Sequence, residues 1–199
     1  IWTAKKRYIL NSWDIEGVRY KEPQLKIMGI EAVKSSTPAP CREKIKEALK
    51  IMMNGDEKML NTFIQHFRED FMKLSPEEIA YPRSCNGVNK FRGESSLFSK
   101  GAILYNHCIV ENKLDHKYPL IAEGDKIRFL HLRQPNRYQS TAFSFMTDVP
   151  KELDIIDKID YDTQFTKSFV EPLTAITKSM NWLIDDSYGV QGSLEDFFG

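Results

Sequence analysis

Consecutive residues near the start of the sequence combine positive charge with a phenol: Lys5, Lys6, Arg7 and Tyr8. Apolar residues follow them directly, so the run is expected to open a β-strand. Because side chains alternate between the two faces of a strand, Lys6 and Tyr8 should share a face. A cation and a phenol on one face can contact a phosphate and a minor-groove acceptor of a nucleic-acid duplex. Taken alone, this run is weak evidence for such a ligand.

A second candidate anion site is the segment Lys34-Ser35-Ser36-Thr37-Pro38. Thr37 followed by Pro38 is typical of the start of a helix, with Thr37 as the N-cap. The hydroxyls of Ser35 and Ser36, with backbone amides at the head of that helix, could hold a phosphate, and Lys34 adds positive charge. The alternative interpretation is an ordinary helix cap without a ligand.

Residues 82–100 form a basic segment that is rich in small side chains and interrupted by one acid, Glu94. Such a loop would let a phosphate backbone approach closely, as at the tip of a domain lying in the minor groove of a duplex. The alternative is a flexible surface loop without a ligand. Arg83 belongs to this segment, and the residues expected to contact a nucleic acid are Asn86, Asn89, Lys90, Arg92 and Lys100.

Catalytic and metal-binding patterns are missing from the sequence. Nucleotidyl transfer with two metal ions needs two or three convergent carboxylates. Asp14 and Glu16 suit a turn instead, and the acids of residues 154–162 suit a solvated helix face. The histidines have no zinc-like spacing with the cysteines, so we expect neither catalytic nor metal-ligating residues in this chain. The sequence has three widely spaced cysteines, Cys41, Cys85 and Cys108. Their small number and wide spacing predict free thiols in a reducing compartment.

Charge is distributed unevenly, although the formal net charge of the 199 residues is zero. Residues 1–50 carry 11 Lys and Arg against 6 Asp and Glu, a net +5, whereas residues 151–199 carry 4 against 10, a net −6. A basic front and an acidic back suit a protein that turns one face to a polyanion. A bipolar protein without such a partner fits the charge equally well. No apolar run reaches transmembrane length and no secretory signal is present, so we expect a soluble protein without a membrane partner.

Hydrophobic periodicity predicts an α+β fold that is mostly helical. Residues 6–29 suit a strand hairpin whose turn places Gly17 at positive φ. Residues 126–130 alternate charged and apolar side chains, as a half-exposed strand of a small antiparallel sheet does. The expected helices run from Pro38 to Asn54, over 60–74, after a Ser75 capping box, around 102–105, from Val149 through Ile159, and over about 162–182 with a kink at Pro172.

The sequence ends with Ser193-Leu194-Glu195-Asp196-Phe197-Phe198-Gly199. Leu194, Phe197 and Phe198 are apolar residues of a terminal peptide, where we expect no core left for them to join. Exposed, they would favour aggregation, whereas docked in a cleft of a partner they would act as anchors. The alternative is a tail that folds back on its own domain.

The order of these motifs resembles the region after the catalytic carboxylates in family B DNA polymerases, most closely those of T-even-type bacteriophages. There, a Lys-x-Tyr motif on a palm strand follows the duplex backbone, and a Lys-Ser-Ser-Thr-Pro segment enters the thumb. Residues 85–90 and 100–106 are similar to two basic elements of the family. Residues 169–173 resemble its Phe-x-Lys-Pro-Leu pattern, but Glu171 replaces the lysine. Lys167 therefore remains the candidate phosphate contact in that region.

The resemblance implies a palm edge at residues 1–33, a thumb domain at 34–183 and a tail with a sliding-clamp peptide at 184–199. The chain would be an excised fragment or the small subunit of a split DNA-directed DNA polymerase. It would grip primer–template duplex and tether the enzyme to its clamp.

The tyrosine-glycine-aspartate metal motif of the family is absent. The resemblance therefore implies that Mg²⁺ and catalysis belong to a separate catalytic polypeptide. The expected setting is the cytoplasm of the infected bacterial host. The alternative is a free-standing, non-catalytic duplex-DNA-binding protein.

Overall fold

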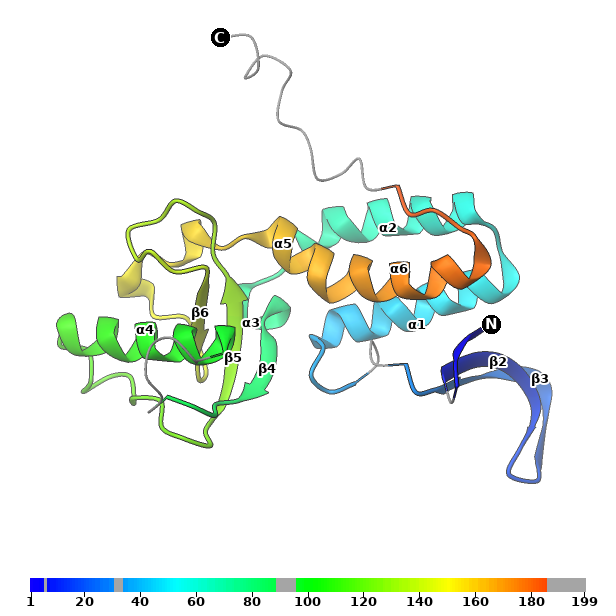
Figure 1. Cartoon of the computed structure of the whole chain (residues 1–199), viewed down its shortest axis with the longest axis horizontal. Helices are drawn as coiled ribbons and strands as arrows, with labels where there is room; N and C mark the ends of the chain where they lie inside the picture. The colour runs from blue at the N-terminus through cyan, green and yellow to red at the C-terminus, as the bar shows by residue number, and fades with distance from the viewer. Residues whose placement is uncertain (6, 31–33, 89–95, 186–199) are drawn as a thin grey trace, which may run out of the picture.

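The computed structural model describes residues 1–5, 7–30, 34–88 and 96–185. Figure 1 shows a helical part, formed by α1, α2, α5 and α6, beside a part in which α4 packs against a small sheet. A second sheet, formed by the N-terminal strands, lies next to α1. The fold is α+β, as the sequence predicts, and both sheets are three-stranded and antiparallel. None of the helices in the described ranges is long and apolar enough to cross a membrane.

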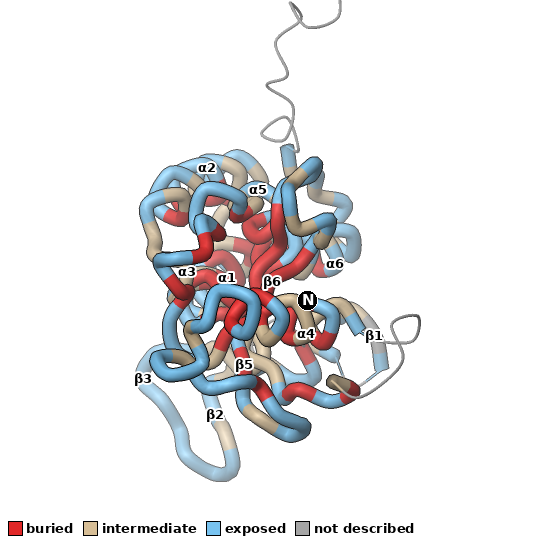
Figure 2. Tube along the Cα trace, turned by 90° about the vertical axis from the view of Figure 1, so that its left-hand side faces the viewer, coloured by how far each residue is buried: buried red, intermediate tan, exposed pale blue. Residues whose placement is uncertain are grey.

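The N-terminal sheet contains the predicted hairpin. Its strands are β1 (Trp2–Ala4), β2 (Arg7–Ile15) and β3 (Val18–Met28), in the order β1-β2-β3. Glu16 and Gly17 join β2 to β3 with φ angles of 56° and 84°, as expected for a tight hairpin turn that suits the twist of the strands. Ile9 is fully buried beside α1, but the hairpin is otherwise mostly exposed (Figure 2).

Two helices follow the N-terminal sheet, α1 (Ala39–Asn54) and α2 (Glu57–Phe71). Their predicted apolar faces are buried, and α1 ends at Gly55 as expected. The predicted N-cap of α1 is wrong. Pro38, not Thr37, occupies the N-cap position, and no side chain caps the helix. Proline fixes its own φ near the required value, so the helix begins after it without a capping side chain.

The central sheet has the strand order β4-β5-β6. A short helix, α3 (Pro76–Ile79), starts at the predicted Ser75 capping box and leads into β4 (Tyr81–Ser84). The other strands are β5 (Lys126–His131) and β6 (Ala142–Phe145). Helix α4 (Leu97–Glu111) packs tightly on β6. Gly101 allows this close contact, since a Cβ at this position would lie only 2.7 Å from Ser144 Oγ.

The acidic helix predicted from Val149 through Ile159 is wrong. The chain forms two short 3₁₀ turns, Lys151–Leu153 and Ile156–Lys158, separated by Asp154 with a φ of 45°. A residue in the left-handed region ends a right-handed helix. The apolar side chains of this segment are nevertheless buried: Leu153, Ile155 and Ile159.

The predicted long C-terminal helix is present but not uniform. It consists of α5 (Tyr161–Phe165), a π-helical turn (Thr166–Val170), α6 (Glu171–Thr177) and a last 3₁₀ turn (Lys178–Met180). The π turn ends at Val170, two residues before Pro172, where the missing N–H disrupts regular α-helical hydrogen bonding. Aromatic rings join this helix to α2: those of Phe67, Phe71, Phe165 and Phe169.

Candidate nucleic-acid interface

A cleft of about 440 Å³ gathers polar and basic side chains from four separate segments. Arg7 begins β2, Ser36 precedes α1, Arg83 lies on β4, and Lys167 lies in the π turn. We term this site the first cleft. The sequence predicted Arg7, Ser36 and Lys167 as separate contacts, and the fold brings all three to one place.

Arg83 is held in a fixed orientation. Its Nη1 donates to the backbone oxygens of Ser36, at 2.7 Å, and Pro82, at 3.0 Å. Its guanidinium also lies over the rings of Tyr81 and Phe129, 5.6 and 6.0 Å from their centroids. Contacts of this kind orient a guanidinium without neutralising its charge. The composition of residues 82–100 predicts a loop at Arg83, whereas this residue lies on β4. The available signal was the Ser75 capping box: it starts the short helix α3, after which the chain continues into β4 with Arg83.

A second cleft, of about 590 Å³, adjoins the first and shares Ser36 and Arg83 with it. Two further basic residues line it, Lys126 and Arg128, both exposed on β5. The alternation of charged and apolar residues correctly predicted the strand, but the sequence analysis gave these two cations no role. The two clefts together place basic side chains from both sheets and from the C-terminal helix along adjoining hollows.

The first cleft also contains one carboxylate. Glu171 Oε1 lies 3.6 Å from Lys167 Nζ, one helical turn away. Both side chains are about half exposed, at 58% and 47%, so solvent weakens this ion pair. A phosphate that enters the cleft can therefore compete with Glu171 for Lys167.

The serines do not lie at the head of a helix, as the sequence had predicted. Ser35 and Ser36 belong to a turn in which the Thr37 amide donates to the Lys34 oxygen at 3.1 Å, and α1 begins only at Ala39. The helix-head part of the prediction is therefore wrong, because the helix starts beyond Pro38. The serines line the clefts instead, and contact with a phosphate stays a prediction.

Other predicted contacts lie apart from the two clefts. Lys5 is exposed in the turn before β2, and the Tyr8 ring stacks on Trp2 with centroids 5.2 Å apart. Asn86 is exposed, and its carbonyl accepts from Ser99 Oγ at 2.7 Å. Lys100 is exposed in the first turn of α4, not in a loop. Lys34 is exposed before α1 but lines neither cleft. The remaining predicted residues lie outside the described residues: Lys6, Asn89, Lys90, Arg92, Leu194, Phe197 and Phe198.

Burial favours the neutral forms of Tyr81, which lines the first cleft, and of two other buried titratable groups. Burial raises the pKa of the Tyr81 phenol well above its usual range. Burial and the nearby Lys167 lower the pKa of His131. Burial also raises the pKa of the Cys41 thiol to about 11, although a hydrogen bond to Ser168 opposes the shift. The three cysteines are free, as predicted, and all three are buried. The charge of the first cleft therefore comes from its arginines, Lys167 and Glu171.

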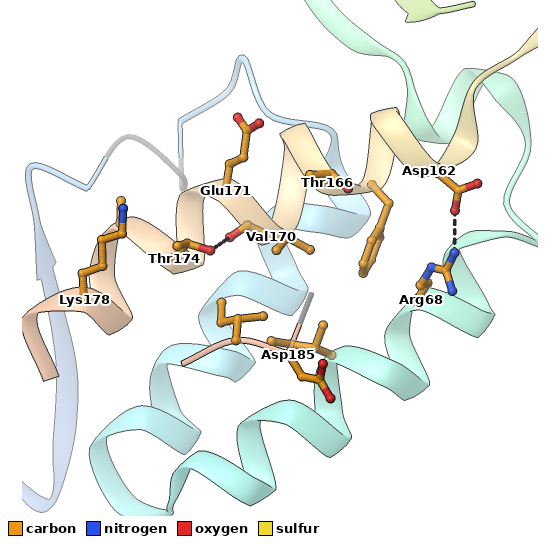
Figure 3. Close-up of a pocket in the computed structure, with 12 residues that line it drawn as sticks. Arg68, Asp162, Thr166, Val170, Glu171, Thr174, Lys178 and Asp185 are labelled. Carbon is orange, nitrogen blue, oxygen red and sulfur yellow. Dashed lines mark hydrogen bonds and ion pairs between the residues drawn. The ribbon is translucent and has the colours of Figure 1, made fainter. Parts of the chain in front are cut away.

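A groove that shares Glu171 and Ala175 with the first cleft has a different character (Figure 3). It measures about 510 Å³ and lies between α2 and the C-terminal helix. Its arginine is neutralised, since Arg68 Nη2 lies 2.6 Å from Asp162. The last described residues cross α2 here: Asn61 accepts from the Asp185 amide and donates to the Leu183 oxygen. The groove has mixed charge and contains none of the residues predicted to contact a nucleic acid.

Comparisons with known proteins identify one class of relative, the DNA-directed DNA polymerases. The enzyme of Escherichia phage RB69 is 35% identical over 208 residues, and that of Enterobacteria phage T4 is 30% identical over 208 residues. The alignments include 99% and 100% of this chain but 22% of each relative, so the chain spans about a fifth of their length. The resemblance to a C-terminal part of a T-even-type phage DNA polymerase is thereby confirmed. No protein-family model matches the chain.

Within the described ranges, no group of three or more His, Cys, Asp or Glu side chains lies close enough together to hold a metal ion.

Proposed function

We propose that this chain is the thumb-containing C-terminal fragment or subunit of a family B DNA polymerase and grips primer–template duplex behind the active site. The observation that carries the proposal is the first cleft, where cations from distant segments converge. Arg7, Arg83 and Lys167 would contact phosphates of the duplex backbone. Such contacts position a protein on DNA without reading its sequence.

Nucleotide addition would take place in a separate catalytic polypeptide, in the cytoplasm of the infected host. Its carboxylates would hold the Mg²⁺ ions that stabilise the reacting phosphates. This chain would contribute binding and orientation of the duplex. The pure chain should therefore incorporate no nucleotide on any primer–template with Mg²⁺ or Mn²⁺. Robust extension by the chain alone would contradict the proposal.

Duplex binding should be non-specific and sensitive to salt. Replacing Arg7 and Lys167 by alanine together should weaken binding equally on all sequences. Each lost phosphate contact should lower the slope of log K against log salt by about 0.9. The matched control is Lys58→Ala with Lys113→Ala, two exposed cations that line neither cleft. If both double variants bind like the unaltered chain, the first cleft does not grip DNA.

A free-standing duplex-binding protein would show the same salt behaviour. Mixing the chain with a catalytic polymerase fragment separates the two functions, because the thumb assignment alone expects restored primer extension. Duplex binding without any effect on extension would favour the free-standing protein.

We further propose that the terminal peptide docks on a sliding clamp through Leu194, Phe197 and Phe198. Aromatic anchors dominate small interfaces, so replacing both phenylalanines by alanine should weaken binding by about 2 kcal/mol, roughly thirtyfold. The measurement is titration of a cognate clamp with the full chain, with a chain ending at Trp182 and with the isolated peptide. Equal binding by the full and the shortened chain would exclude the peptide as the ligand of the clamp.

A further inference from the structure

We propose that the second cleft binds a run of successive phosphates on one strand of the duplex. This inference rests on the proposed function and extends it to Ser84, Lys126 and Arg128, which no sequence motif singles out as contacts. The binding residues would be Lys126 and Arg128 on β5, Ser84 on β4, and Ser35 with Ser36 before α1.

The strand geometry gives the second cleft regularly spaced cations. Lys126 and Arg128 are separated by one residue of β5, so their side chains leave the same face about 6.6 Å apart. The intervening residue, Ile127, is 2% exposed and turns into the core. In the pairing with β4, Ser84 lies opposite Lys126 and Pro82 lies opposite Arg128. This spacing is comparable with that of neighbouring phosphates along a nucleic-acid strand.

The chemistry of the lining favours an anion more strongly here than in the first cleft. The described residues that line the second cleft include three cations and three serines, but no Asp or Glu. The first cleft, by contrast, contains Glu171. Serine hydroxyls can donate to phosphate oxygens while the cations supply charge. Arg128 also has a long contact, 3.5 Å, from its Nη1 to the Glu77 backbone oxygen, which leaves its charge uncancelled.

Continuity with the first cleft indicates an extended ligand and not a small one. Arg83 and Ser36 belong to both linings, and the contact between them forms the boundary that the clefts share. A polyanion that leaves Lys167 and Arg83 therefore meets Arg128 and Lys126 next. A single phosphate could occupy only one of these positions at a time.

The test is fluorescence-anisotropy titration of the full chain with a mixed-sequence DNA duplex over a range of salt concentrations. Lys126→Ala with Arg128→Ala should lower the salt slope by about 1 per cation and weaken binding alike on all sequences. Lys126→Arg with Arg128→Lys, which keeps both charges, should bind like the unaltered chain. The Lys58→Ala and Lys113→Ala control should also leave the slope unchanged. Both β5 side chains are exposed, so thermal melting should be unchanged in every variant.

Phosphate-ethylation interference shows which phosphates of the DNA contact the protein. The β5 double variant should lose sensitivity at neighbouring phosphates of one strand, next to those lost in the Arg7 and Lys167 double variant.

Failure of this inference can be distinguished from failure of the proposed function. If the β5 double variant binds like the control while the first-cleft variant binds weakly, this inference is overturned and the proposed function stands. If the unaltered chain does not bind duplex, both fall. If inorganic phosphate at matched ionic strength displaces duplex from the unaltered chain but not from the β5 double variant, the second cleft is a small-anion site, and the run of phosphates is excluded.

Discussion

The N-terminal sheet and the central sheet have the same number of strands and the same antiparallel pairing, yet their side chains are covered very differently. Every residue of β6 is buried, and Leu130 on β5 has no exposed surface. In the N-terminal sheet, Trp13 is 60% exposed and Met28 is 45% exposed. Helix α4 and the C-terminal segments cover the central sheet, whereas the N-terminal sheet meets α1 on one face (Figures 1 and 2).

The outer face of the N-terminal sheet is partly apolar, since Tyr8, Leu10 and Met28 lie on it beside polar residues such as Ser12, Gln24 and Lys26. Ile9 pairs with Ile27 on the face toward α1, while Tyr8 pairs with Met28 on the opposite face. An unbroken apolar run, such as Tyr8-Ile9-Leu10, is typical of strands that are buried on both faces. Strand pairing alone therefore does not bury the side chains of a sheet. Under the proposed function, the catalytic polypeptide covers the outer face.

The largest expected difference concerns local opening of the two sheets in the isolated chain. Amides of the central sheet should exchange only through near-global unfolding, about 5–15 kcal/mol, whereas those of β2 and β3 should exchange through much easier openings. Hydrogen exchange followed by mass spectrometry gives both values. Adding a catalytic polymerase fragment should slow exchange in the N-terminal sheet alone. Equal protection of both sheets in a dilute, monomeric chain would break the comparison.

Truncating one large side chain in each sheet should show the same contrast in stability. Phe143 is fully buried, so Phe143→Ala should reduce the free energy of unfolding by about 3–5 kcal/mol. Trp13→Ala should change it by no more than about 0.5 kcal/mol, because that side chain is mostly exposed. Urea titration monitored by circular dichroism measures both. A large loss for Trp13→Ala would mean that the chain covers the hairpin itself.

A smaller difference in the free energy of unfolding is expected when the amide side chain that links each sheet to a helix is replaced. Gln164 is fully buried, accepts from the His131 amide at 3.1 Å and donates to the Ile79 oxygen at 2.7 Å. Gln164→Leu leaves both groups unpaired and should destabilise the fold by about 1–3 kcal/mol. In the N-terminal sheet, Asn11 donates to Asn54 at 3.4 Å at an exposed position, and Asn11→Ala should cost less than about 0.5 kcal/mol. Equal losses in urea titration would show that both links matter alike.

The smallest expected effect is in DNA binding and compares one arginine from each sheet. Arg83, from the central sheet, lies over two rings, so Arg83→Lys should weaken duplex binding about two- to fivefold. Arg7, from the N-terminal sheet, is exposed, and Arg7→Lys should stay within about twofold. Anisotropy titration at one salt concentration is sufficient. A larger effect at Arg7 would mean that its geometry, and not its charge alone, matters.

Local signals in the sequence predicted much of the fold. The periodic apolar residues of α1 and α2, the Ser75 capping box and the turn at Gly17 depend on neighbouring residues, and each is present. The helix predicted from Val149 to Ile159 was wrong, because long-range packing buries the side chains of Leu153 and Ile155 without helical structure.

The candidate site was predicted only in part. Arg7, Ser36 and Lys167 were named from motifs, but nothing local indicates that they converge in one cleft. Lys126 and Arg128 were missed because charges that alternate on a strand look like an ordinary solvated face. Their relation to Ser36 and Arg83 depends on the pairing of β4 with β5, which links distant parts of the chain.

The π turn between α5 and α6 fixes a phase between the two helices. Successive residues of an α-helix are about 100° apart around its axis, and a π turn holds one residue more than an α turn. Deleting one residue from Thr166–Val170 would therefore convert the π turn into an α turn and leave the orientation of α6 relative to α5 unchanged. The buried residues Leu173 and Ile176 would keep their positions in the core, whereas one residue inserted into α6 would rotate the residues after it by about 100°. The π turn is thus a place where a single-codon deletion, which preserves the reading frame of the gene, should leave the packing of the C-terminal helix intact.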